Sequence, residues 1–175
     1  MKEIVDLYDL MLEQLRDLYN GEQQQLQALP EFAEMADAYK LTELIEHHIK
    51  ETRHQETRLQ RVFSIIDEDP AGEECDGIKG LIKEAYKLAH RCENPEPFDA
   101  GLISSIQHIN HYEIAGYGTA IAYAKALERH DIAEILLKTL REEKKADEEL
   151  SDLAEAKINV DAAWTSLVGK AEKTQ

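Results

Sequence analysis

Four long stretches of this chain carry apolar residues at every third or fourth position, the spacing that lines one face of an α-helix. In the first stretch, for example, Leu15, Leu18 and Leu26 share one face. The long predicted helices cover about 4–29, 41–66, 98–127 and 132–153. Only eight glycines and four prolines interrupt the 175 residues, and this composition favours long helices over many short strands. The sequence therefore predicts an all-α fold.

The lengths of the connections indicate how these helices are arranged. Pro30 should kink or end the first helix, with a short helical piece up to about residue 39, and a tight turn at 129–131 joins the last two helices. The connection from the second to the third long helix is longer and holds a predicted helix of its own over about 75–90. Two antiparallel hairpins joined by one long crossover form a ferritin-like four-helix bundle. We expect this bundle to span residues 1–158, followed by a C-terminal tail, 159–175, that docks through Trp164 and Leu167.

Charge and composition restrict the partners and the compartment. With 20 Lys and Arg against 36 Asp and Glu, the net charge is −16, which repels nucleic-acid phosphates and anionic membrane surfaces. The N-terminus lacks the basic head and apolar block of a signal peptide, and the most apolar stretch, 114–127, is too short to span a bilayer. Cys75 and Cys92 match no metal-finger spacing and are expected to be free thiols. We expect a soluble cytoplasmic protein that binds neither nucleic acid nor membrane.

Each long helix also carries one glutamate within or beside its apolar face: Glu22, Glu51, Glu113 and Glu143. Glu22 and Glu51 are 29 residues apart and Glu113 and Glu143 are 30 apart, so the two hairpins should bring all four carboxylates to one level. Burying four unpaired carboxylates would cost on the order of several kcal/mol each, and no Lys or Arg lies beside them on the inner faces. We expect two Fe or Mn ions to neutralise them. Protonation of the carboxylates is the alternative.

Two neighbouring residues are alternatives for the second metal ligand that the helix over 41–66 would supply. Glu51 and His54 form the ExxH pair found in di-iron and di-manganese bundles. Gln55 lies closer to the apolar centre and mirrors the offset between Glu143 and Asp147 on the last helix, where no histidine follows at the ExxH spacing. The candidate metal ligands are therefore Glu22, Glu51, His54, Glu113, Glu143 and Asp147, with Gln55 as the alternative to His54.

Other polar residues on these helices have simpler interpretations. We expect His48 to be a core histidine that is hydrogen-bonded to a carboxylate, and His111 to face another helix or a second subunit. Tyr19 and Tyr117 lie one turn from buried glutamates and are candidates to donate hydrogen bonds to them, with ordinary core packing as the alternative. Glu142 and its charged neighbours are expected to form a solvated helix face.

Four sequence blocks resemble the signature segments of the YciF-like ferritin-like proteins. They are 13–19 (EQLRDLY) followed by Glu22, 48–52 (HIKET) with Gln55, 111–119 (HYEIAGYGT) and 142–147 (EEKKAD). The resemblance extends from about residue 7 to residue 154, and it implies a ferritin-like bundle with a dinuclear metal site in a stress-linked bacterial protein that forms dimers. The matching acidic positions are Glu22, Glu51, Glu113, Glu143 and Asp147. His54 departs from the family pattern, which has its polar partner at the position of Gln55.

Together, the residues and the resemblance favour a dinuclear-metal oxidoreductase that reacts with peroxide or oxygen, in the manner of manganese catalase or rubrerythrin. The alternative is a non-catalytic stress protein in which the same residues bind metal for buffering or stability, or only stabilise a structural bundle. A homodimer is the expected assembly, formed through the crossover helix and the region of Trp164.

Overall fold

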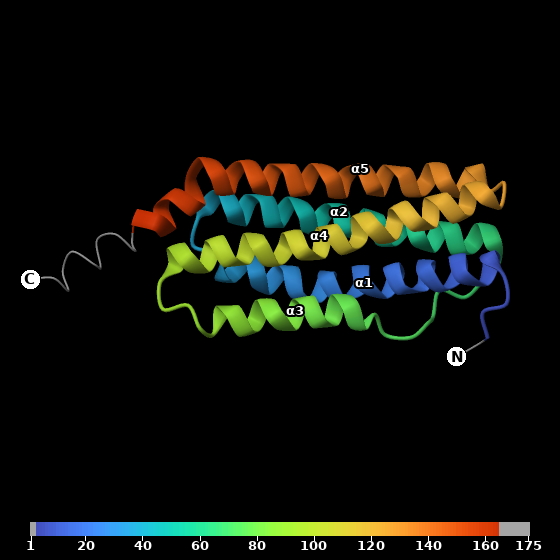
Figure 1. Cartoon of the computed structure of the whole chain (residues 1–175), viewed down its shortest axis with the longest axis horizontal. Coiled ribbons are helices and arrows are strands. Elements are labelled where there is room, and N and C mark those ends of the chain that lie inside the picture. Colours follow the sequence, from blue (N-terminus) through green and yellow to red (C-terminus); the bar gives the residue numbers. More distant parts are fainter. Residues whose placement is uncertain (1–2, 165–175) are drawn as a thin grey trace, which may run out of the picture.

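The computed structural model describes residues 3–164, and this part of the chain is helical with no strand. The helices, drawn in Figure 1, are α1 (Leu7–Met35), α2 (Tyr39–Ile66), α3 (Asp76–Ala89), α4 (Pro95–Ala126) and α5 (His130–Leu153). A π-helical turn at Ala154–Ile158 follows α5, and the chain then continues as α-helix through residues 159–164. None of these helices is both long and apolar enough to cross a bilayer. The predicted all-α fold is confirmed.

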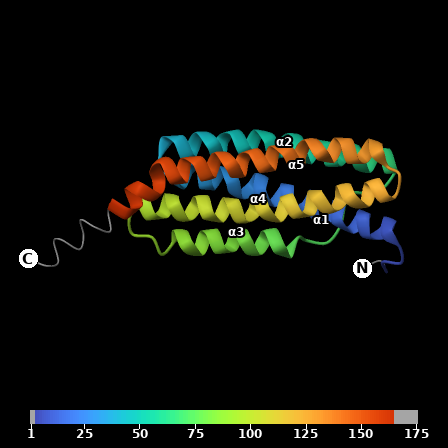
Figure 2. The same ribbon diagram turned by 45° about the horizontal axis from the view of Figure 1, so that its top comes forward.

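The four long helices form a bundle of two antiparallel hairpins, α1 with α2 and α4 with α5. The hairpins pack together through α1 against α4 and α2 against α5. The crossover helix α3 lies outside this bundle, along α1 and α4, in both views (Figures 1 and 2). This arrangement is the four-helix bundle with one long crossover that the lengths of the connections predict.

The helix boundaries follow from local chemistry. The Asp6 side chain caps the start of α1 by accepting a hydrogen bond from the backbone N–H of Asp9, at 2.9 Å. Asn94 precedes α4, and Pro95 occupies its first turn, where a missing N–H costs nothing. The alternative that Pro30 ends the first helix is wrong, because α1 continues to Met35 and includes most of the short helical piece expected beyond the proline. Buried Phe32 beyond the proline packs into the core and holds this last part of the helix in place.

The crossover helix is docked closely. Cys75 lies at its N-terminus, where its backbone N–H donates to the Asn20 side chain at 2.7 Å. Two glycines allow the approach of α3 to α4: a Cβ atom on Gly77 would lie 2.5 Å from the Tyr112 ring, and one on Gly101 would lie 2.3 Å from Leu88. Cys75 and Cys92 form no disulfide, as expected.

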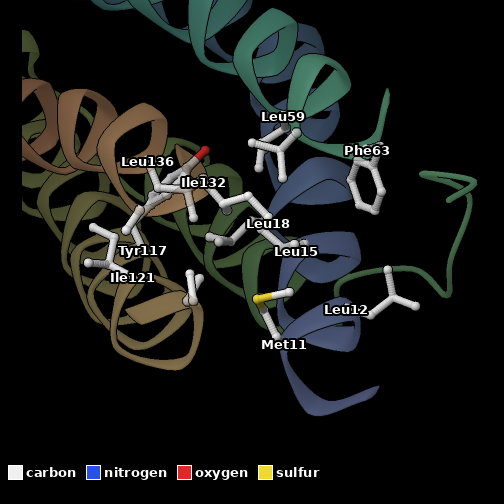
Figure 3. Close-up of a cluster of buried hydrophobic side chains, with 14 residues drawn as sticks. Met11, Leu12, Leu15, Leu18, Leu59, Phe63, Tyr117, Ile121, Ile132 and Leu136 are labelled. Carbon is white, nitrogen blue, oxygen red and sulfur yellow. The ribbon is translucent and has the colours of Figure 1, made fainter. Parts of the chain in front are cut away.

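The interior has two large hydrophobic clusters with polar residues between them, and a third, small cluster of Cys75, Ile78 and Ile109 lies between α3 and α4. The first cluster includes Met11, Leu15 and Phe63, and Figure 3 shows it close up. The second includes Phe32, Ile45 and Leu102, nearer the opposite end of the bundle. Between the two lies a set of buried polar residues, which we call the polar layer: Glu22, Gln25, His48, Thr52, Gln55, Asn110, Glu113, Thr139 and Glu143. The candidate functional site lies in this layer.

Candidate metal centre

Three of the predicted glutamates lie in the polar layer without solvent contact. Glu22 on α1 is 0% exposed, Glu113 on α4 is 1% exposed and Glu143 on α5 is 0% exposed. The apolar periodicity of each helix directs these positions inward, because side chains three and four residues away on the same face belong to the core. Each helix thus forces one carboxylate into the interior.

Amide and phenol groups from neighbouring helices hold these carboxylates. Gln25 Nε2 donates to Glu113 at 2.6 Å, and Gln55 Nε2 donates to Glu143 at 2.7 Å. The hydroxyl of Tyr117 donates to Glu22. Two of these hydrogen bonds therefore tie the hairpins together, each from a glutamine of the first hairpin to a glutamate of the second.

Burial and mutual repulsion raise the pKa of all three carboxyl groups well above the usual value. Desolvation is the largest cause in each case. The next cause is a neighbouring carboxylate: Glu143 acts on Glu22, Glu22 acts on Glu113, and Glu113 acts on Glu143. The three groups therefore lie within electrostatic reach of one another, and neutrality requires protons or cations.

Six oxygen atoms of the layer are buried and accept no hydrogen bond: Oε2 of Glu22, Glu113 and Glu143, Oε1 of Gln25 and Gln55, and Oδ1 of Asn110. An unpartnered buried acceptor costs about 1–3 kcal/mol. Carboxylate and amide oxygens are the ligands that hard cations prefer, so this set of oxygens fits Mn or Fe better than a thiolate-binding metal. Within residues 3–164, however, no three His, Cys, Asp or Glu side chains are already assembled closely enough to hold a metal ion.

The fourth predicted glutamate is turned partly outward. Glu51 Oε1 lies 3.4 Å from His47 Nε2, and its side chain is 18% exposed. Burial raises the pKa of the Glu51 carboxyl, and His47 opposes that shift. To join the other three carboxylates, Glu51 would have to leave His47 and rotate toward the interior.

The two alternatives on α2 face different sides of the helix. His54 is exposed, whereas Gln55 is fully buried and bonded to Glu143. On α5, Asp147 is about one-fifth exposed and lies beside α4, where Gln107 donates to it at 3.0 Å and His111 approaches to 3.3 Å. Neither His54 nor Asp147 belongs to the polar layer, because a residue on a helix reaches only the face toward which it points.

Of the other polar residues, some make the hydrogen bonds expected of them and others do not. Tyr117 bonds a glutamate as expected, but Tyr19 accepts a hydrogen bond from Gln60 at 3.1 Å and packs against Phe63. His48 is buried, but the expected hydrogen bond to a carboxylate is absent, since neither ring nitrogen has a partner. His111 is largely exposed beside the last helix.

Sequence reasoning missed several members of the site. Gln25 follows Glu22 by one turn on the same face and could have been found from that spacing, as could Asn110, one turn before Glu113. Arg58 lies at the edge of the layer, where it donates to Glu142 at 2.8 Å and to Thr139 at 3.0 Å. Its charge lowers the pKa of Glu22. The expectation that Glu142 lies on a solvated face is wrong, because this ion pair half-buries it.

Comparison with known proteins places these features in context. Residues 6–163 match the family described as a domain of unknown function, DUF892. Protein YciF of Escherichia coli (strain K12) is 34% identical over 163 residues, which cover 91% of this chain and 95% of that protein.

Solved structures give the same result. The structure of the E. coli stress protein YciF has a TM-score of 0.85 at 34% identity, covering 89% of this chain and 99% of that one. YcfI from Rhodopseudomonas palustris has a TM-score of 0.84 at 40% identity, covering 86% and 96%. A protein from Xanthomonas campestris, with a TM-score of 0.72 at 19% identity over 91% and 98%, shares the fold.

Proposed function

Because the chain belongs to the DUF892 family, the family of the YciF stress protein, we propose that its polar layer is a dinuclear site for Fe or Mn that reacts with peroxide or oxygen. The observation that carries the proposal is the set of six buried oxygen atoms that no donor satisfies. A pair of cations would satisfy these oxygens and neutralise the three carboxylates at once.

The residues that would hold the ions come from all four helices of the bundle. Glu22, Glu113 and Glu143 would supply carboxylate oxygens, and Glu51 would join them after turning inward from His47. Gln25 and Gln55 would offer their amide oxygens or keep orienting the carboxylates they bind. When bound, Fe or Mn ions supply the change of oxidation state that reduction of peroxide or oxygen requires.

The protein groups around the layer have roles of their own. Tyr117 holds a proton at its hydroxyl toward Glu22, and burial raises the pKa of this phenol well above the usual value. The phenol therefore stays protonated near neutral pH and keeps donating its hydrogen bond to Glu22. The hydrophobic clusters on either side exclude water, which strengthens electrostatic interactions inside the layer.

Elemental analysis of protein purified without chelators tests the proposal, with Glu113→Gln and Glu148→Gln prepared in parallel. Glu148 is exposed on α5 outside the layer and serves as the matched control. We expect about two Fe or Mn per chain in the wild type and the control, and a loss of at least half in Glu113→Gln. Metal-loaded wild type should consume hydrogen peroxide or oxidise ferrous ion. The absence of metal from all three proteins after aerobic loading would overturn the proposal.

A second candidate function is a non-catalytic one. Each of the three buried carboxylates already accepts one hydrogen bond, from Gln25, Gln55 or Tyr117, so the layer can also persist as a protonated hydrogen-bonded network. A structural role has been suggested for YcfI of R. palustris. Metal that binds without any peroxide or ferrous-oxidation activity would favour metal buffering or structural stabilisation over catalysis.

A further inference from the structure

A small cavity lies beside the polar layer, on the side of the second hydrophobic cluster. Its volume is about 10 Å³, which is room for one water-sized molecule. Most of its wall is apolar and comes from all four helices of the bundle, including Leu29, Ile45, Ile106 and Leu150. One buried polar side chain, His48 of α2, also lines it.

His48 is poised to bind a ligand in this cavity. It is 4% exposed, and neither Nδ1 nor Nε2 has a hydrogen-bond partner. Burial, aided by the neighbouring His47, lowers the pKa of His48 to about 4, so the ring is neutral near pH 7. A neutral imidazole offers one N–H donor and one acceptor nitrogen. It therefore complements a neutral molecule that both donates and accepts.

The outer side of the cavity selects against anions. It is lined by His47, Glu51 and Glu149, and the His47 side chain is about half exposed. The two carboxylates repel anions such as superoxide, and the apolar wall disfavours any charged species. Water matches both the size and the hydrogen-bonding capacity. Hydrogen peroxide has the same hydrogen-bonding capacity but is one oxygen atom larger, so only one of its two oxygens fits in the cavity.

On α4 and α5, residues of the cavity wall lie one or two helical turns from the buried carboxylates. On α4, Asn110 lies one turn beyond Ile106 of the cavity and one turn before Glu113 of the carboxylate set. Asn110 is fully buried, and neither atom of its amide has a partner. On α5, Ala146 of the cavity wall lies one turn from Glu143. The unpartnered amide of Asn110 thus lies on α4 at a level between Ile106 of the cavity wall and Glu113.

We propose that this cavity binds one hydrogen peroxide molecule against His48, and that Asn110 leads it on to the carboxylates. One oxygen would occupy the cavity at the imidazole, and the other would extend toward His47. The delivery step rests on the function proposed above. Binding at His48 does not, because it requires only the cavity and the two free ring nitrogens.

Binding is tested on metal-free protein labelled with ¹⁵N-histidine, by following the ring nitrogens in long-range ¹H–¹⁵N spectra while hydrogen peroxide is added. We expect a saturable shift of the His48 nitrogens and no comparable shift at exposed His54. Ala146→Val narrows the cavity and should weaken the His48 response at least fivefold. Ala133→Val, at a buried alanine of α5 outside the cavity, is the control. The proposal would be overturned if the His48 nitrogen shifts did not change, or if the His48 and His54 nitrogens shifted in parallel.

Delivery is tested separately with Asn110→Leu. The variant should keep the His48 response to peroxide, while the metal-loaded form consumes peroxide at least tenfold more slowly than wild type. An unchanged rate would remove Asn110 from the path. A protein that binds no metal but retains the His48 shift would overturn the proposed function and leave the binding site in place.

Discussion

Among single residues, the buried glutamates show how this chain holds charge in its interior. Glu22, Glu113 and Glu143 each accept one hydrogen bond and leave one oxygen without a donor. Without a cation, the folded protein must keep protons on this set, because burial and repulsion raise the pKa of each carboxyl. The pH dependence of stability therefore reports on the layer directly.

Metal-free protein should lose stability as the pH rises above about 5. The unfolded carboxyls release their protons near pH 4.5, whereas the folded ones retain theirs to higher pH, so the unfolded state binds fewer protons and ∂ΔG/∂pH is negative. Each such group contributes up to about 1.4 kcal/mol per pH unit. His48 acts in the opposite direction below pH 6.5, but as a single group.

Urea denaturation at pH 5, 6, 7 and 8 measures this slope for wild type, Glu143→Gln and Glu148→Gln. Glu143→Gln keeps an oxygen that accepts from Gln55 but cannot ionise, so its slope should be shallower by one group. The exposed Glu148→Gln variant should retain the wild-type slope. A wild-type free energy of unfolding that is flat from pH 5 to 8 would contradict protonation of the layer.

Among the helices, the crossover helix depends on a close approach to α4. Tyr112 of α4 donates to Asp17 at 2.8 Å and contacts the Cys75 sulfur at 3.5 Å, so its ring is held against the start of α3. Gly77 faces that ring, whereas Gly80, one turn further along α3, is exposed, and a Cβ atom there would meet no atom within 4 Å. The two glycines provide a matched pair on one helix.

Gly77→Ala should destabilise the protein by roughly 1–3 kcal/mol, because the new methyl group must displace the Tyr112 ring or shift α3. Gly80→Ala should instead stabilise it by up to about 1 kcal/mol, because alanine is the better helix former and meets nothing. Urea denaturation of both variants gives the two values. Equal effects of the same sign would show that the close approach at Gly77 does not limit the packing of α3.

In the molecule as a whole, the C-terminal end of the bundle leaves apolar surface uncovered. Trp164 is 68% exposed and Val160 is 59% exposed, so the expected docking of Trp164 is not seen, and Leu167 lies outside the described residues. A groove of about 510 Å³ runs beside them, lined in part by Ile158 and Ala38. Such a surface is a candidate interface for a second copy of the chain.

We therefore expect a homodimer in which Trp164 becomes covered. Sedimentation velocity should give a dimer for the wild type, and Trp164→Ser should shift it toward monomer by at least tenfold in dissociation constant. Trp164 is the sole tryptophan of the sequence, so its fluorescence should move to longer wavelength as the protein is diluted. A dimer whose Trp164 fluorescence does not change on dilution would assign the interface to another face.

The periodicity of the chain is enough to predict the fold and most of the buried carboxylates. Apolar spacing gives the four long helices, and the lengths of the connections give the crossover, because each amphipathic helix can bury its apolar stripe only against others. The same periodicity identifies Glu22, Glu113 and Glu143 as interior residues, since a helix fixes the direction of every side chain along it.

Which neighbouring polar groups meet those glutamates depends instead on the packing of the helices. Gln25 bonds Glu113 and Gln55 bonds Glu143, and the residues of each pair are 88 positions apart in the sequence. These pairings depend on how the two hairpins are rotated and shifted against each other. The same packing left a cavity beside His48. Periodicity along one helix cannot specify these contacts, because they are set by the relative placement of four helices.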